Sequence, residues 1–148
     1  MQGIIVFSAR FLIIIPLLAT AVCFIAKREH QLAVKSLLAI LIANIISEIS
    51  KAVIPVNRPF VGVSPNPGIW IPFGFGSFFS GHIATLFALG ILLYKKHQKL
   101  ALMCFCFGAL IGALRVLIKV HYPIDIVGGA AVGVLAGLIA IRVKPIWV

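Results

Sequence analysis

Long apolar runs, several near or above the length that crosses a bilayer, constrain this chain more than any other feature. About 20 apolar residues in a helix are needed to cross a hydrocarbon core of ~30 Å. Because 62% of the 148 residues are hydrophobic and only 11% are charged, the composition is not that of a soluble domain. We predict one domain, residues 1–148, that is an all-α polytopic membrane helix bundle.

Five membrane-spanning helices are expected along the sequence. They cover about residues 4–26, 32–54, 80–94, 100–119 and 124–141. The first span is interrupted by Arg10 and Pro16, and the third is short. A connection rich in proline, glycine and aromatic residues, 55–79, shows almost no helical pattern and separates the second span from the third.

Basic residues at the ends of the spans predict their orientation. The clusters 27–35, 95–99 and 142–144 share one side if the five spans alternate, and such clusters are typically cytoplasmic. The N-terminus, the connection 55–79 and the turn 119–123 then face outward. We therefore expect a multi-pass protein of the plasma (inner) membrane. Its charge of +10 is expected to set the topology or to bind anionic headgroups or an anionic substrate, and not nucleic acid.

Polar residues on the expected outer side are not explained by topology. They are Lys51 and Arg58 after the second span, Ser80, Gly81 and His82 at the start of the third, and Arg115, His121 and Asp125 around the last turn. Guanidinium and ammonium groups bind phosphate oxygens, and backbone N–H groups at a helix start add further donors. The set predicts a site that binds and attacks an anion, with phosphate as the natural candidate.

His121 and Asp125 lie four residues apart, and Pro123 between them suits the first turn of a helix. A carboxylate in that turn is also favoured by the helix dipole. Asp125 could therefore bind one ring nitrogen of His121 and direct the other outward, as in a base that activates a nucleophile or a group that orients a base. The alternative is a helix cap beside an interfacial histidine.

A polar stripe runs along the second span. Asn44, Ser47, Glu48 and Lys51 recur at i, i+3, i+4 and i+7, which places them on one helix face. In lipid such a face turns inward, and ionisable groups on it are functional candidates. We expect Glu48 to neutralise and steer Lys51, although an ion pair that serves only packing has the same pattern.

The sequence resembles the type-2 phosphatidic acid phosphatase family of membrane lipid phosphatases, which is related to the vanadium haloperoxidases. The first family motif, Lys-x6-Arg-Pro, is matched by Lys51, Arg58 and Pro59. The second, Pro-Ser-Gly-His, is matched by Ser80, Gly81 and His82, with Phe79 where proline is usual. The third, Ser-Arg-x5-His-x3-Asp, is matched by Arg115, His121 and Asp125, with Leu114 where serine is usual.

The resemblance implies a mechanism without metal or cofactor. His121, positioned by Asp125, attacks phosphorus to form a phosphohistidine, and His82 protonates the leaving oxygen and then activates water. The groups implied to hold the phosphate oxygens are Lys51, Arg58, Ser80, Gly81 and Arg115, supported by Glu48 and Pro59. One carboxylate at the site is too few for a magnesium cage, so no metal ligand is expected.

The substrate expected at the outer interface is a lipid phosphate or diphosphate. Polyprenyl diphosphate, phosphatidic acid and phosphatidylglycerol phosphate all fit, and the nearby aromatic residues either bind the lipid or anchor the protein in the interface. These residues are Trp70, Phe73, Phe75, Phe78 and Phe79. A lipid phosphotransferase and a non-catalytic anion- or lipid-binding membrane protein are the alternatives, and the oligomeric state stays open. The family commonly has six spans, and the one absent here would be N-terminal.

Overall fold

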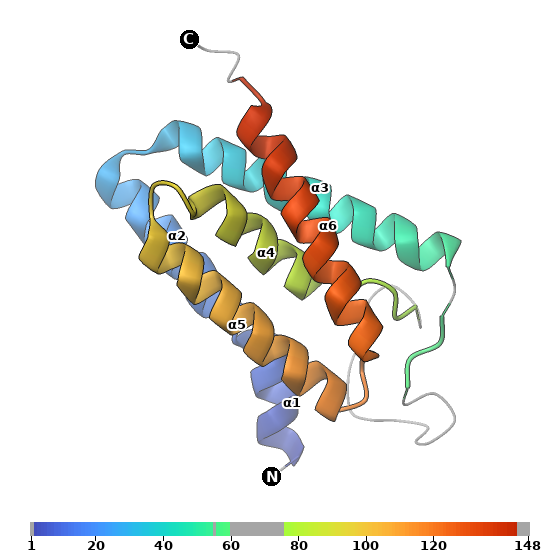
Figure 1. The fold of residues 1–148 in the computed structure, drawn as a ribbon. Helices are drawn as coiled ribbons and strands as arrows, with labels where there is room; N and C mark the ends of the chain where they lie inside the picture. Colours follow the sequence, from blue (N-terminus) through green and yellow to red (C-terminus); the bar gives the residue numbers. More distant parts are fainter. Residues whose placement is uncertain (1, 55, 60–75, 145–148) are drawn as a thin grey trace.

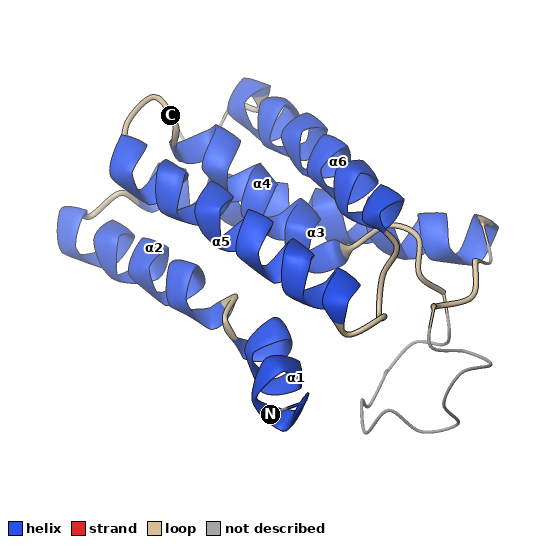
Figure 2. Cartoon of the chain, turned by 60° about the horizontal axis from the view of Figure 1, so that its bottom comes forward, coloured by secondary structure: helices blue, strands red, loops and turns tan. Residues whose placement is uncertain are grey.

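The structure, a computed structural model, describes residues 2–54, 56–59 and 76–144 (Figure 1). Six helices form within these residues: α1 (Gln2–Phe11), α2 (Ile14–Lys27), α3 (His30–Val53), α4 (Gly81–Leu93), α5 (Gln98–Leu117) and α6 (Pro123–Arg142). The one β-bridge of this part of the chain pairs Asn57 with Gly76. The predicted all-α helix bundle is confirmed (Figure 2).

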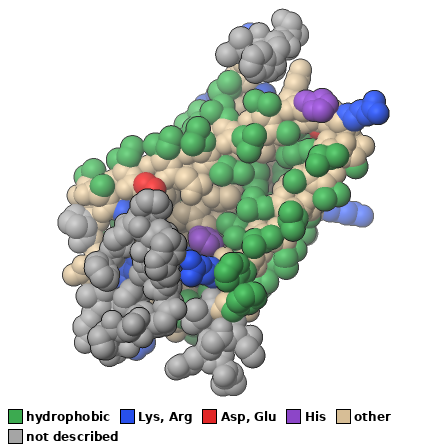
Figure 3. Space-filling model, turned by 180° about the vertical axis from the view of Figure 1, so that it is seen from behind, with side chains coloured by type: hydrophobic (Ala, Val, Ile, Leu, Met, Phe, Trp, Pro, Cys, Tyr) green, Lys and Arg blue, Asp and Glu red, His purple; other side chains and the backbone are tan. Residues whose placement is uncertain are grey.

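Four segments are long and apolar enough to cross a membrane. They are Phe7–Lys27, His30–Val53, Gln98–Leu117 and Pro123–Arg142, which correspond to the first, second, fourth and fifth predicted spans. Hydrophobic side chains run along the face of the bundle seen in Figure 3, as expected where helices meet lipid instead of water. This protein is therefore a multi-pass membrane protein.

The first predicted span is two helices. α1 ends at Phe11, α2 begins at Ile14, and the backbone turns between them at Leu12 and Ile13. Pro16 accounts for the break, because its ring clashes with the carbonyl of the residue four positions earlier, which is Leu12. Pro16 itself lies in the first turn of α2, where a missing N–H is tolerated.

Helix α4 lies at the centre of the bundle, between α5 and α6, and it also packs against α3 (Figures 1 and 2). Nine of its 13 residues are buried. A helix of this length rises only ~20 Å, which is too short to cross a membrane without help. Because α4 is surrounded by other helices, its ends meet protein and polar groups, which explains how the short third span is accommodated.

Glycine residues of α6 let this helix approach α4 closely. A Cβ atom on Gly129 would lie 2.7 Å from the carbonyl oxygen of Ser80, and one on Gly133 would lie 2.4 Å from that of Ala84. The backbone N–H of Ser80 donates to the carbonyl oxygen of Asp125 at 3.1 Å. The first turns of α4 and α6 are thereby held side by side.

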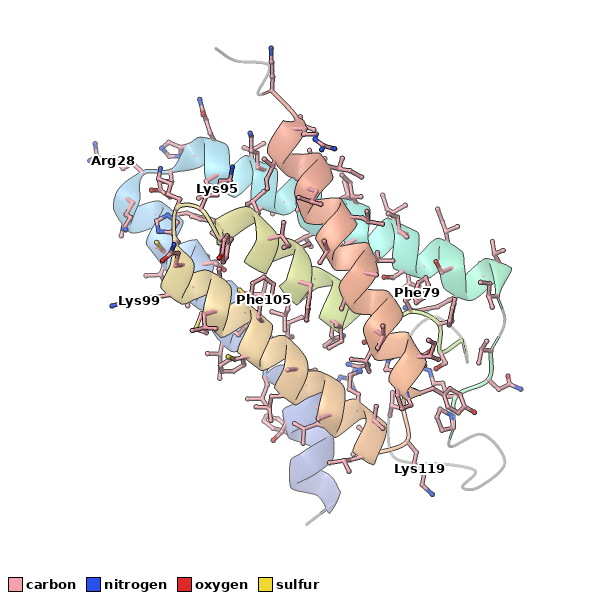
Figure 4. All side chains as sticks on the ribbon, viewed as in Figure 1. Arg28, Phe79, Lys95, Lys99, Phe105 and Lys119 are labelled. Atoms are coloured by element: carbon pink, nitrogen blue, oxygen red, sulfur yellow. The ribbon has the colours of Figure 1, made fainter. Side chains whose placement is uncertain are left out.

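The predicted basic clusters lie together at one end of the bundle. Arg28, Lys95 and Lys99 gather there in Figure 4, and Lys119 lies at the opposite end. The Lys35 ammonium donates to the carbonyl oxygen of Ile141 at 3.0 Å, which ties the first cluster to the last turn of α6. The end away from these clusters is where the three motifs meet.

Candidate active site

The three motifs meet around one cavity of about 440 Å³. The predicted residues that line it are Glu48, Lys51, Arg58, Gly81, His82, Arg115 and His121. They come from the end of α3, the segment after it, the start of α4, the end of α5 and the turn before α6. The fold therefore collects in one place residues that are spread over half of the chain.

His121 and Asp125 form the predicted pair. The Nδ1 atom of His121 lies 3.4 Å from Oδ2 of Asp125, and both side chains are buried. The same oxygen accepts the backbone N–H of Tyr122 at 2.8 Å, because Tyr122 is the N-cap of α6 and Asp125 completes its capping box. Since Nδ1 faces the carboxylate, Nε2 is the ring nitrogen left for chemistry in the cavity.

Burial lowers the pKa of His121 to about 4, and the hydrogen bond to Asp125 opposes this shift only in part. The positive charges of Arg115 and Arg58 lower the pKa further. The imidazole is therefore neutral at physiological pH. A neutral ring with its Nδ1 proton directed to a carboxylate carries a free electron pair on Nε2, as a nucleophile requires.

Arg58 and Arg115 each have a buried N–H donor that no group of the described residues accepts. Nη1 of Arg58 is 3.5 Å from the carbonyl oxygen of Val120, and Nη1 of Arg115 is 3.5 Å from that of Ala9, both long for hydrogen bonds. The Nε atoms of both arginines are buried without a hydrogen-bond partner among the described residues. A buried donor without an acceptor is costly, so this arrangement favours binding of an anion.

Lys51 is paired with the Glu48 carboxylate one turn earlier on α3, as the polar stripe predicts. Both side chains line the cavity, and Glu48 is the more exposed of the two. Further along the same stripe, the Asn44 amide donates to the hydroxyl oxygen of Thr85 on α4 at 3.0 Å. Asn44 of the stripe thus joins α3 to α4, and Glu48 and Lys51 border the cavity.

His82 lies in the first turn of α4 and lines the same cavity as His121, close enough for their charges to interact. The backbone of Arg10 hydrogen-bonds to the His82 ring, so α1 covers this part of the site. Ser80 is fully buried, and its hydroxyl has no partner among the described residues. Ser80, Asp125 and Pro59 are not among the residues that line the cavity.

Sequence reasoning missed Ser77, whose hydroxyl donates to Oδ2 of Asp125, and Thr85. A serine in a Gly/Phe-rich connection is an ordinary turn residue, so the sequence carried no signal for Ser77. The replacement of proline by Phe79 is accommodated by a glycine, because a Cβ atom on Gly128 would lie 2.0 Å from the Phe79 ring. Nothing in the structure explains Leu114.

The aromatic residues Trp70, Phe73 and Phe75 lie outside the described residues. Phe78 and Phe79 are described, and their rings stack with centroids 4.0 Å apart. Both side chains are partly buried. These two rings therefore pack on each other beside the start of α4.

A neutral imidazole held by a buried carboxylate lies beside a second histidine and two arginines with buried N–H donors that no described residue accepts. This arrangement is the one expected of an enzyme that attacks a phosphate group at the end of a membrane helix bundle.

Comparison with known proteins shows the family to which this chain belongs. The model of the PAP2 superfamily matches residues 32–147, which is most of the chain, and this protein belongs to that family. The family predicted from the motifs is confirmed, and the chain is a phosphatase that acts on membrane lipid phosphates or diphosphates. The match begins within α3, so α1 and α2 lie outside it.

Two curated relatives are similar to the chain over most of its length, and a third over less than half of it. The bacitracin transport permease protein BcrC of Bacillus licheniformis is 25% identical over 148 residues, 98% of this chain and 72% of that protein. An undecaprenyl-diphosphatase of Sulfolobus acidocaldarius is 26% identical, over 97% of this chain and 71% of its own. The undecaprenyl-diphosphatase BcrC of Bacillus subtilis is 30% identical over 45% of this chain and 34% of its own. No solved structure matches the chain significantly.

Proposed function

We propose that this protein hydrolyses a polyprenyl diphosphate, with undecaprenyl diphosphate as the first compound to test, to the monophosphate and inorganic phosphate. One observation carries the choice of a lipid. The cavity that holds the cations continues into an apolar wall formed by Ile13, Leu17 and Ile40. Ile40 lies about 16 Å from Lys51 along α3, at 1.5 Å per residue.

The apolar wall and the cations match the two parts of such a substrate. The diphosphate binds Arg58, Arg115 and Lys51, and the first isoprene units lie against the apolar wall. Two relatives are named as undecaprenyl-diphosphatases, which supports a diphosphate over the glycerolipid phosphates that the motifs also fit. The cavity volume of about 440 Å³ is that of an ordinary small-molecule site, so most of a long chain would stay in lipid.

The proposed reaction begins with attack on the terminal phosphorus by Nε2 of His121. The bond between this phosphorus and the bridging oxygen breaks, and His82 gives its proton to that oxygen. An anionic phosphate beside His82 favours the protonated ring that this step needs. His82 then removes a proton from water, which attacks the phosphohistidine and releases phosphate. Asp125 stabilises the positive charge that the His121 ring carries while it is bonded to phosphorus.

We also propose that the site faces outward across the plasma (inner) membrane. The basic clusters gather at the end away from the site, which by the positive-inside tendency is the cytoplasmic end. Lys119→Cys and Gln98→Cys, each in a protein without the three native cysteines, test this orientation. An impermeant thiol reagent should label intact cells only at position 119, and labelling only at position 98 would reverse the topology.

The experiment that tests the function is phosphate release by purified protein in detergent. The substrates are undecaprenyl diphosphate, undecaprenyl phosphate, phosphatidic acid and phosphatidylglycerol phosphate, each with excess chelator. We expect the diphosphate to be turned over fastest and the chelator to change nothing, because fixed cations bind the phosphate. Transfer of phosphate to an added alcohol in place of water would identify a phosphotransferase. Binding without turnover of any substrate would identify a non-catalytic lipid-binding protein.

A further inference from the structure

Ser77 lies outside the three motifs, yet its side chain contacts the catalytic pair. The Ser77 hydroxyl is fully buried and donates a hydrogen bond to Oδ2 of Asp125. This is the oxygen that faces Nδ1 of His121. Ser77 is not among the residues that line the cavity, so any effect on substrate has to pass through Asp125.

The backbone around Ser77 fixes the place of its hydroxyl. Its N–H donates to the carbonyl oxygen of Val56 at 2.9 Å, and Gly76 beside it pairs with Asn57 in an antiparallel bridge. A Cβ atom on Gly76 would lie 3.1 Å from Cβ of Lys51, so the segment passes close to the end of α3. The two ends of the connection are thus joined, and one of them holds Ser77 against α6.

Among the described residues, all donors to the Asp125 carboxylate converge on one oxygen. Oδ2 accepts hydrogen bonds from the Ser77 hydroxyl, from the backbone N–H of Tyr122 and from Nδ1 of His121. Oδ1 is buried with no hydrogen-bond partner among the described residues. The terminal torsion of an aspartate is soft, so its rotation depends on such contacts. Tyr122 and His121 come from the turn directly before α6, whereas Ser77, of the described residues, reaches the carboxylate from a distant part of the chain.

We infer that Ser77 is a positioning residue for phosphoryl transfer, which sets the rotation of the Asp125 carboxylate and thereby the ring of His121. The inference rests on the proposed function and adds to it a third member, Ser77–Asp125–His121. Ser77 forms and breaks no covalent bond and keeps its proton throughout. Because it does not touch the substrate, its loss acts on the rate of phosphorylation and leaves substrate binding unchanged.

The first test compares Ser77→Ala with Ser77→Thr and with Ser36→Ala. Ser36 is also buried, donates to the carbonyl oxygen of Leu32 in its own helix, and lies at the end away from the site, so it controls for loss of a buried hydroxyl. We expect Ser77→Ala to lower kcat about 10- to 100-fold, by analogy with the loss of an outer partner that orients a metal-binding histidine. KM should not change, Ser77→Thr should recover part of kcat, and Ser36→Ala should match the unmodified protein.

The second test places Ser77→Ala in an Asp125→Asn background. A residue that acts through Asp125 loses its effect once the carboxylate is gone. The two substitutions together should therefore lower kcat by less than the product of the factors that each causes alone. The inference is overturned if Ser77→Ala leaves kcat unchanged, raises KM alone, or costs the same factor in both backgrounds.

A third readout does not depend on activity. The measurement is a nuclear magnetic resonance spectrum of protein labelled with ¹⁵N histidine. The His121 signal is identified as the one that is missing from the spectrum of His121→Gln. Ser77→Ala should shift that signal while Ser36→Ala leaves it in place, and an unmoved signal would overturn the inference. If no lipid phosphate is hydrolysed, the proposed function fails and this measurement still decides the role of Ser77. Ser77→Cys, which keeps a weaker donor, replaces Ser77→Ala if the alanine variant does not fold.

Discussion

Each end of the bundle carries a histidine paired with a carboxylate, and the two pairs are built differently. At the site end, Nδ1 of His121 lies 3.4 Å from Asp125. At the opposite end, Nε2 of His97 lies 2.6 Å from Glu29, which also binds the Lys96 ammonium at 3.0 Å. The second pair has the shorter distance and joins the turn before α3 to the turn before α5.

The surroundings of the two pairs decide what each can do. Around His121 the cations include the buried Arg58, whose Nε–H has no acceptor within the part of the chain that the structure describes, whereas Lys95 and Lys99 near His97 are exposed. An exposed lysine is already solvated and gains little from an anion. A buried arginine gains far more, because an anion satisfies donors that water does not reach. The two ends thus differ more in the burial of their cations than in the histidine–carboxylate pair itself, and the proposed catalysis depends on that burial.

Replacing each of the two histidines by alanine should give the largest difference in turnover between the two ends of the bundle. His121→Ala removes the nucleophile, so we expect no turnover and no acid-labile phosphoenzyme after rapid quench with labelled substrate. His97→Ala should keep turnover close to that of the unmodified protein and lower only its thermal stability. Labelled phosphate on His82 in the His121→Ala protein would reverse the two catalytic roles.

A smaller loss is expected at the second histidine of the site. His82→Ala should bind substrate and react about 10²–10⁴-fold more slowly, the usual contribution of general acid–base catalysis. Para-nitrophenyl phosphate has a leaving group that needs less protonation, so it should partly restore phosphoenzyme formation. Burst kinetics with both substrates measure this difference, and an equal loss on the two would argue against proton transfer by His82.

The ion pair on α3 gives a graded test of how cations act at the site end. Lys51→Met should lower kcat/KM by about 10²-fold, as expected for loss of a group that stabilises charge in the transition state. Glu48→Gln should cost less, because it frees the ammonium of Lys51 without removing it. Steady-state rates on one lipid diphosphate decide the order. A loss in Glu48→Gln as large as that in His121→Ala would give Glu48 a catalytic role.

The smallest effect is expected at Glu29 and depends on pH. Hydrogen bonds with His97 and Lys96 hold the pKa of Glu29 below its ordinary value of 4.5. A carboxyl group whose pKa is lowered on folding stabilises the fold above its unfolded pKa and loses that effect as the pH falls through the folded pKa. Glu29→Gln should therefore melt at a lower temperature than the unmodified protein at neutral pH, with unchanged turnover.

This difference in melting temperature should shrink as the pH falls below 4.5. Thermal unfolding in detergent over a range of pH measures it, and His30→Gln, which changes an exposed neighbour at the start of α3, is the control. A difference that stays constant down to acid pH would mean that the Glu29 charge does not stabilise this end of the bundle.

The sequence alone determined features that depend on local patterns. Apolar runs of the right length placed the spans within a few residues of α3, α5 and α6, since a helix in lipid satisfies its own backbone. The contact between His121 and Asp125 was predictable because both belong to one helix start, and that between Glu48 and Lys51 because they are one turn apart.

Only the tertiary structure decided what lies around these local pairs. Ser77 reaches Asp125 across 48 positions, and the Arg115 guanidinium meets the carbonyl oxygen of Ala9 across 106. The central place of α4, the buried donors of the arginines and the apolar wall at Ile13 all follow from how the helices pack. Periodicity and spacing do not encode such contacts, because each of them depends on the approach of two elements that are remote in the chain and on the side chains that fill the space between them.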